Sequence, residues 1–310
     1  MFGRPNIGGR VTKANNVTPL QNKLYNEALS IQQQKAKDAK SITFMPRSLV
    51  LATLPHSDPG AVPAWGRKNG AYSLVLQPGY RIDDKGEAIS IGLPYGTKPR
   101  LLLCWLTTEA VKTKSRTIKL ADSLSEFMAK LDLHDTGGKN GSRTHFRNQM
   151  IRLFSAQISC VYSTEGEFAR QSLAITDETH LWWDPKSPDQ IALWESTIVL
   201  GEKFFEEIIE RPIPIDFRAL KALKNSCMSI DLYIWLTYRL SRLGAPAVIP
   251  WNELKTQFGS EYARERKFRE KLVDSLKKVL VVYRDAKVTP QDNGLLLYPS
   301  RTSVSINASF

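Results

Sequence analysis

The chain has 310 residues, a length that predicts two domains at about 150 residues each. Its 43 Lys and Arg residues outnumber its 31 Asp and Glu residues, and the resulting net charge of +12 is typical of proteins that bind nucleic acid or an anionic membrane surface. The three dispersed cysteines exclude a disulfide scaffold and indicate a reducing compartment. Neither a secretory signal nor a long apolar run occurs, so we expect a cytoplasmic protein without a membrane span.

The first 98 residues fall into two segments with different patterns. Residues 1–40 are polar and basic, and we expect a flexible N-terminal arm with a disordered start and a short helix within 20–40. In residues 41–98, short apolar runs at 48–52 and 72–76 alternate with Pro and Gly. This pattern predicts a β-rich extension of short strands.

Residues 99–211 are predicted to form a first winged-helix module. A helix, a strand, two further helices and a hairpin, in that order, are typical of a helix-turn-helix with an attached β-hairpin. The expected elements are a helix at 100–112, a strand at 116–120, a helix capped by Asp122 or Ser123, a glycine-rich turn at 137–141, a helix at 142–154, and hairpin strands at 156–163 and 168–176.

Residues 212–310 are predicted to repeat this order as a second winged-helix module. The expected elements are a buried helix at 230–243, a strand at 247–250, a helix capped by Asn252, a long helix at 260–280, and hairpin strands at 281–288 and 295–298 that are turned at 292–294. The predicted fold class is therefore α+β, with two tandem winged-helix modules after a β-rich N-terminal extension.

Matching residues support a duplication of the two modules. Trp105-Leu-Thr107 matches Trp235-Leu-Thr237 at an offset of 130 residues, as Leu124 matches Leu254. After the glycine-rich turn the offset becomes 122, where Phe146, Met150, Phe154 and Val161 match Phe268, Leu272, Leu276 and Tyr283.

The helix at 142–154 has one apolar face and one polar face without acids. Arginine can bond guanine bidentately and Asn can bond adenine, whereas Thr and Lys hold phosphates. The candidate DNA-binding residues here are Lys139, Arg143, Thr144, Arg147, Asn148 and Arg152.

The helix at 260–280 offers a second candidate surface, in which basic residues alternate with Glu261, Glu265 and Glu270. For this helix alone, a solvated surface held by ion pairs is an equally good interpretation. The candidate DNA-binding residues are Arg264, Arg266, Lys267, Arg269 and Lys271 on the helix, with Arg284 and Lys287 on the expected wing.

Other residue clusters point away from catalysis. The aromatic residues at 182–183, 194 and 204–205 have acidic neighbours, which favours packing over base stacking. Glu202, Glu206, Glu207 and Glu210 form an acidic helical surface that we interpret as a partner or dimer face. The four histidines lie far apart and the cysteines form no zinc pair. The sequence therefore predicts no catalytic residue, no metal site and no cofactor.

Several longer motifs resemble the plasmid-encoded replication initiators called RepA, over residues 41–299. They include Phe44-Met-Pro-Arg47, Gly92-Leu-Pro-Tyr-Gly96, Trp105-Leu-Thr-Thr-Glu-Ala-Val111, Leu181-Trp-Trp-Asp-Pro-Lys186 and Trp235-Leu-Thr-Tyr-Arg-Leu240. The resemblance implies a bacterial protein that binds double-stranded DNA at plasmid origin repeats (iterons) and helps to open the duplex. It also implies recruitment of the host initiator and replicative helicase, and a dimer–monomer switch that controls copy number.

The family resemblance and the charge pattern favour different helices as the main DNA-recognition helix. In wider initiator families the C-terminal module recognises the sequence, which favours the basic residues of 264–271, whereas the acid-free pattern slightly favours Arg143 and Arg147. We retain both sets and expect a plasmid replication initiator that is not an enzyme. The alternatives are an origin nickase or primase, and a transcriptional repressor on the same scaffold.

Overall fold

The computed structural model describes residues 18–120, 128–129, 131, 133, 142–181, 196–259 and 261–304. It contains both helices and small antiparallel sheets, which confirms the α+β class. Across the described residues, no helix is both long and apolar enough to cross a membrane. Asp122, Ser123, the glycine-rich turn, the tryptophans at 182–183 and 194, and the first 17 residues lie outside this description.

The elements before residue 98 make up the expected helix and extension. In chain order they are α1 (Pro19–Gln33), β1 (Ile42–Met45), α2 (Arg47–Leu51), β2 (Trp65–Asn69), β3 (Tyr72–Gln77), β4 (Tyr80–Ile82) and β5 (Ala88–Ser90).

The middle of the chain contains α3 (Thr97–Thr113), β6 (Thr117–Lys119), α5 (Ser142–Ser155), β7 (Gln157–Ser163), β8 (Phe168–Ala174), β9 (Thr176–His180), β10 (Thr197–Leu200) and α6 (Glu202–Glu210). The last third contains β11 (Ile213–Asp216), α7 (Phe217–Leu223), α8 (Cys227–Leu240), β12 (Ala247–Pro250), α9 (Trp251–Phe258), α10 (Glu265–Val282), β13 (Val288–Pro290) and β14 (Gly294–Leu297).

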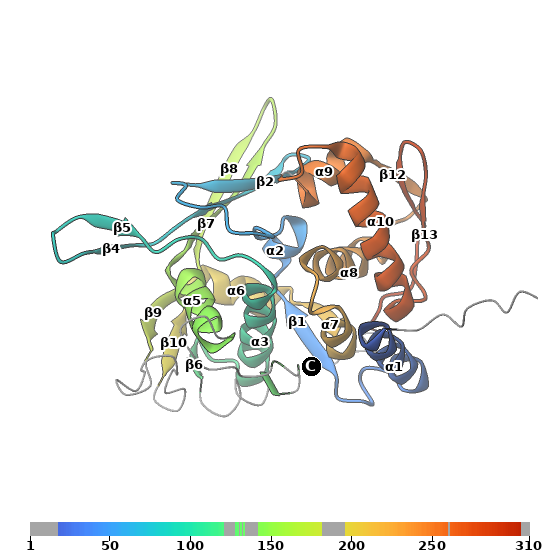
Figure 1. The fold of residues 1–310 in the computed structure, drawn as a ribbon, viewed down its shortest axis with the longest axis horizontal. Helices are drawn as coiled ribbons and strands as arrows, with labels where there is room; N and C mark the ends of the chain where they lie inside the picture. Colours follow the sequence, from blue (N-terminus) through green and yellow to red (C-terminus); the bar gives the residue numbers. More distant parts are fainter. Residues whose placement is uncertain are drawn as a thin grey trace, which may run out of the picture.

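The helix α1 belongs to the body of the protein, because it packs against α7 and α10 (Figure 1). It begins with a capping box, in which the Thr18 hydroxyl accepts a bond from the Gln21 backbone and the Gln21 side chain accepts one from the Thr18 backbone. The Arg218 side chain donates to the carbonyls of Ser30 and Gln34, which fixes the far end of α1 on α7.

One expected strand of the extension is wrong, because residues 47–51 form the helix α2. Ser48, Leu49 and Val50 are consecutive and all buried. In a strand with one covered face, buried and exposed residues would alternate instead. The second expected strand is confirmed as β3, in which Leu74 and Leu76 are buried.

The hairpin predicted as the wing of the first module forms, but it pairs elsewhere. β7 and β8 pair with each other, and β7 pairs with β3, so the sheet order is β2-β3-β7-β8. Leu74 lies opposite Cys160, and Leu76 lies opposite Ile158. All four side chains are buried, so the buried residues of β3 and β7 face each other across the pairing. β6 instead pairs with β10, and β10 pairs with β9.

In the last third, the predicted order of elements is confirmed from α8 onward, but several boundaries differ. The α10 helix begins at residue 265 rather than 260, and the first hairpin strand covers residues 288–290 rather than 281–288. The α8 helix covers residues 227–240 rather than 230–243. Pro250 rather than Asn252 precedes the first turn of α9. The residues 281–282 end α10 rather than beginning a strand, because Val279 and Val282 continue its buried face at helical spacing.

The two halves repeat the order of elements. α3 and α8 begin 130 residues apart, as do β6 and β12, and the sheets β6-β10-β9 and β12-β14-β13 have the same order. The matched residues of α5 and α10 (Phe146, Met150, Phe154, Phe268, Leu272 and Leu276) are all buried. The pair Val161 and Tyr283 is not equivalent, because Val161 lies in a strand and Tyr283 caps a helix.

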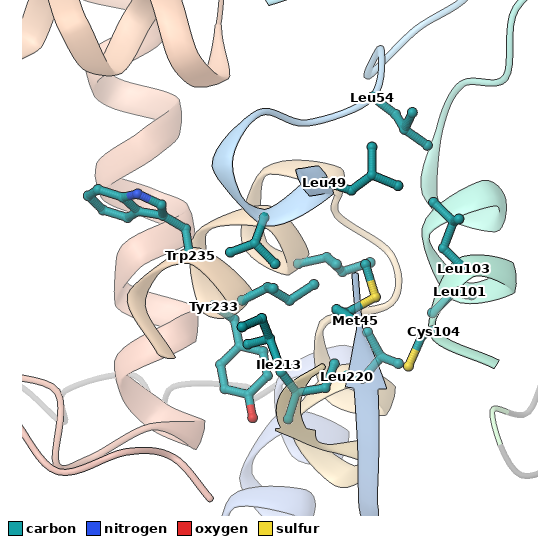
Figure 2. Packing of buried hydrophobic residues seen from close by; sticks show 14 of the residues in the cluster. Met45, Leu49, Leu54, Leu101, Leu103, Cys104, Ile213, Leu220, Tyr233 and Trp235 are labelled. Carbon is teal, nitrogen blue, oxygen red and sulfur yellow. The ribbon is translucent and has the colours of Figure 1, made fainter. Parts of the chain in front are cut away.

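One continuous cluster of buried apolar residues spans the extension and both halves. Figure 2 shows Met45 of β1 beside Cys104 of α3 and close to Leu220 of α7, while Trp235 of α8 points toward the C-terminal elements. The strand β1 also pairs with β11, from Ile42 opposite Asp216 to Met45 opposite Ile213. The extension is therefore part of the common core.

Candidate nucleic-acid interface

The helix α10 has a buried apolar face and an exposed basic face. Phe268 and Leu272 lie at i, i+4 spacing and are fully buried, which turns the intervening charged residues outward. Figure 1 shows α10 and the strands beside it along the right-hand side of the molecule. We call the exposed residues at the start of this helix the α10 basic face, which consists of Arg264, Arg266, Lys267 and Lys271.

One carboxylate partly balances this face. The Glu270 side chain accepts bonds from Arg266 Nε at 3.0 Å and from Lys267 Nζ at 3.3 Å. These bonds lower the pKa of Glu270, so it stays ionised near neutral pH. The side chain of Arg266 is still 89% exposed and that of Lys267 is 69% exposed. Glu265 is also exposed in the first turn of α10. The four cations of the face outnumber these two carboxylates, so the face retains a net positive charge.

Trp251, at the start of α9, connects α10 to the turn of the β13–β14 hairpin. The Arg269 guanidinium lies 4.7 Å from the centre of the Trp251 ring, a cation–π arrangement. The indole Nε1 donates to the carbonyls of Gln291 and Asp292 at 3.0 and 3.1 Å. The hairpin turn at 291–293 is therefore fixed beside the helix. Sequence reasoning missed Trp251 because its partners lie about 40 positions away.

The turn between α9 and α10 is tightly packed. A Cβ atom at Gly259 would overlap the Phe268 ring, so the first residue after α9 has room only for glycine. The Phe268 ring also meets the Tyr262 ring edge to face, with centroids 5.9 Å apart. These contacts fix how α10 leaves α9.

Arg284 and Lys287 are exposed, but they are not on the hairpin as predicted. They lie between the end of α10 and the start of β13, because α10 extends to Val282. The Lys287 backbone is bonded to Ser300 and Tyr298. Both cations therefore lie next to the C-terminal end of α10, and the hairpin turn contains Asp292 instead.

The corresponding surface of α5 is more enclosed. Thr144 and Arg147 are half-buried, and Asn148 is exposed. The Arg152 side chain bonds Asp58 at 3.1 Å and the Leu93 carbonyl at 3.2 Å, and its guanidinium lies 5.2 Å from the Tyr95 ring centre. Arg143 lies in the first turn of α5, its side chain outside the description, and Lys139 lies outside the described residues altogether.

The loop before α3 packs on this same side of α5. The Gln149 side chain accepts a bond from the Tyr95 backbone at 2.8 Å, and the rings of His145 and Tyr95 are 5.9 Å apart. Partial burial, with the nearby charges of Lys98 and Arg152, lowers the pKa of His145. His145 therefore adds less positive charge to this surface than an ordinary histidine would.

The acidic helix α6 keeps one of its carboxylates inside the protein. Glu207 accepts a bond from the Ser48 backbone at 2.6 Å, and burial raises its pKa. Glu202, Glu206 and Glu210 are exposed, whereas Phe204 is buried, which confirms its packing role. Among the described residues, His, Cys, Asp and Glu form no group of three that could hold a metal ion.

Comparison with known proteins identifies the class of this α+β chain. The family described as "Plasmid encoded RepA protein" matches residues 93–252, about half of the chain. The chain belongs to this family, and it is thus a plasmid replication initiator. The matched segment includes α3, α5 and α8 and ends at the start of α9, so α10 lies beyond it.

The chain is also similar to two solved structures of RctB, each containing its domains 2 and 3. They cover 80% and 81% of this chain and 94% and 95% of their own, at 13% sequence identity and with TM-scores of 0.46 and 0.49. A search of curated proteins finds no match.

Proposed function

We propose that this initiator binds repeated sites in a plasmid origin sequence-specifically, promotes opening of the duplex, and recruits the host initiator and replicative helicase. The observation that carries the proposal is the α10 basic face beside a hairpin turn that Trp251 holds in place. A helix with exposed Arg and Lys next to a short hairpin suits the major groove and the adjacent phosphates.

The order of elements supports two winged-helix modules. In the second, α9 and α10 would be the helix-turn-helix, and β13 and β14 the wing, with sheet order β12-β14-β13. In the first module, α5 would correspond to α10, and the sheet β6-β10-β9 would correspond to the sheet β12-β14-β13. The hairpin β7–β8 would then be an insertion. On this basis the boundaries 99–211 and 212–310 describe two modules that share one core.

We propose α10 as the main recognition helix and α5 as an auxiliary one. Arg266 and Arg269 carry guanidinium groups of the kind that bond guanine, although Arg269 would first have to leave the Trp251 ring, and Lys267 and Lys271 can contact phosphates. On α5, Arg147 is half-buried and Arg152 is bonded to Asp58. We therefore assign Arg152 to the scaffold, and Asn148 and Arg143 to auxiliary contacts. The exposed carboxylates of α6 would repel DNA and suit a protein partner or a second copy of the chain.

Gel shifts on the origin repeats test this assignment. Arg266→Ala/Arg269→Ala should lower specific affinity by roughly 1–3 kcal/mol for each lost base contact, and Arg143→Ala/Arg147→Ala should lower it less. Lys112→Ala is the matched control, because Lys112 is an exposed cation on α3, far from α10 in the sequence, and pairs with Glu109 on the same helix. Undiminished specific binding in both double variants would refute the proposal.

The proposed role is non-catalytic, and assays distinguish it from the two alternatives. Incubation with origin DNA, nucleotides and Mg²⁺ should give neither strand cleavage nor primer synthesis; either product would identify an origin enzyme. Deletion of the gene should abolish plasmid replication, whereas a protein that is only a repressor would be dispensable for it.

A further inference from the structure

A buried polar network connects α3 to α8. The Arg100 guanidinium bonds both carboxylate oxygens of Asp231, at 2.6 and 2.7 Å. It also donates to the carbonyls of Leu54, Pro55 and Gly96. Arg100 and Asp231 are 2% and 5% exposed, and therefore both charges are paired away from water. One side chain thus joins the first half, the second half and the loop after α2.

That loop extends the network to the turn between α9 and α10. His56 Nε2 lies 2.9 Å from an Asp231 carboxylate oxygen, and the His56 backbone donates to Glu261 at 3.4 Å. Glu261 lies in the turn that precedes α10. The loop between α2 and β2 is therefore bonded both to α8 and to the turn that precedes the proposed recognition helix.

The strand β2 holds the same turn through the same carboxylate. Arg67 Nη2 lies 2.9 and 3.0 Å from the two carboxylate oxygens of Glu261, and the Arg67 side chain is completely buried against the Trp65 ring. The Leu51 carbonyl accepts bonds from Gln257 of α9 and from Asn69 of β2. The end of α9 and the middle of the α9–α10 turn are thus bonded to the extension.

The extension is also continuous with α5. The strand β2 pairs with β3, and β3 pairs along six residues with β7, which follows α5 after one residue. A hydrogen-bonded sheet therefore runs from the end of α5 to the turn before α10. A slip of this ladder by one residue would move every side chain of the strand to the opposite face.

We propose that the extension is a clamp that fixes the orientation of α10 relative to α5, with Arg67 and Glu261 as positioning residues. The inference rests on the proposed function, because it concerns how two helices meet one DNA site. The Arg67 side chain of this ion pair is completely buried and the Glu261 side chain is 27% exposed. An ion pair with a buried partner is poor at adding stability but can select one geometry. With both helices on one rigid body, the protein accepts a single spacing between the two parts of its site.

The first test measures the orientation without DNA. Nitroxide labels are placed at the exposed positions Asn148 of α5 and Lys271 of α10, and their distance distribution is measured by pulsed electron paramagnetic resonance. The clamp predicts one narrow distribution, which becomes broad in Arg67→Ala/Glu261→Ala. A broad distribution in the otherwise unchanged protein overturns the proposal, even if the double variant fails to fold.

The second test measures spacing on DNA. Five base pairs, about half a helical turn, are inserted between the two contacted parts of the repeat. Two rigidly linked helices cannot both contact the DNA when the two parts of the repeat are turned to opposite sides of the duplex. The affinity of the wild-type protein for the DNA should therefore fall by about 100-fold. In Arg67→Ala/Glu261→Ala, affinity for the unmodified repeat should fall and the insertion should cost only a few-fold, whereas Lys112→Ala should behave as wild type.

The outcomes separate the two proposals. A wild-type protein that tolerates the insertion, or a double variant as sensitive as wild type, overturns the clamp. Absence of any specific binding to the repeats refutes the proposed function instead, and the distance measurement still decides whether the clamp exists.

Discussion

Replacement of Asp231 by Asn should strongly destabilise the protein. Asn keeps the size of the side chain but removes the charge that balances the completely buried guanidinium of Arg100. Breaking a buried ion pair by removing one partner costs about 3–5 kcal/mol. The free energy of unfolding, measured by urea denaturation at pH 7, should fall by that amount.

The pH dependence gives an independent magnitude. The pairing with Arg100, opposed by burial, lowers the pKa of Asp231 from 3.8 to about 2, which corresponds to roughly 2–3 kcal/mol at about 1.4 kcal/mol per pKa unit. Because the pKa is lower in the folded state, this stabilisation is complete above about pH 4 and is lost as the pH falls through about 2. The difference between wild type and Asp231→Asn should shrink over the same range.

Asp274→Asn is the matched control, since this carboxylate is exposed on α10 and lies 3.6 Å from Lys277. Its effect should stay within about 0.5 kcal/mol. A loss below 1 kcal/mol for Asp231→Asn, or a difference from wild type that does not change between pH 6 and pH 2, would refute the account of the network.

Three further substitutions or modifications test other parts of the structure. Gly259→Ala places a Cβ against the Phe268 ring and should lower the free energy of unfolding by about 1–3 kcal/mol; an unchanged urea midpoint would contradict the packing of the turn. Trp251→Phe removes the indole donor and weakens the contact with Arg269, so stability should fall by about 1 kcal/mol and origin affinity should fall as well. If anisotropy titrations show no change in affinity, Trp251 does not position the hairpin. Burial raises the pKa of Cys104 to about 12, and its thiol should therefore resist a disulfide reagent at pH 8 until urea unfolds the protein, as peptide mapping would show.

Local patterns predicted the elements whose signals are contiguous in the sequence. The apolar stretch of α8 and the amphipathic spacing of α10 were both visible, and the offset of 130 residues matched the starts of α3 and α8. The pairing of β7 with β3 was not predictable, because the paired residues are 80 to 90 positions apart in the sequence. The helix α2 was mistaken for a strand because a short apolar run fits either structure when both sides are covered.

In the candidate site, too, local patterns were predictable from the sequence and contacts between distant residues were not. The α10 basic face follows from helical spacing alone, whereas the engagement of Arg152 with Asp58 depends on a contact across 94 positions. Arg67 and Glu261 are 194 positions apart, and neither stands out from other charged residues in the sequence. A single sequence shows which residue types are present, but burial and pairing decide which cations remain available to DNA.

The most direct test of the central claim is the ratio of affinities for an origin repeat and for a scrambled duplex of the same length and composition. Fluorescence anisotropy at physiological salt should give a ratio of about 1,000 or more, and this ratio should fall in Arg266→Ala/Arg269→Ala. Equal affinities for the two duplexes would show that the basic charge attracts DNA without recognising sequence, and would contradict the account.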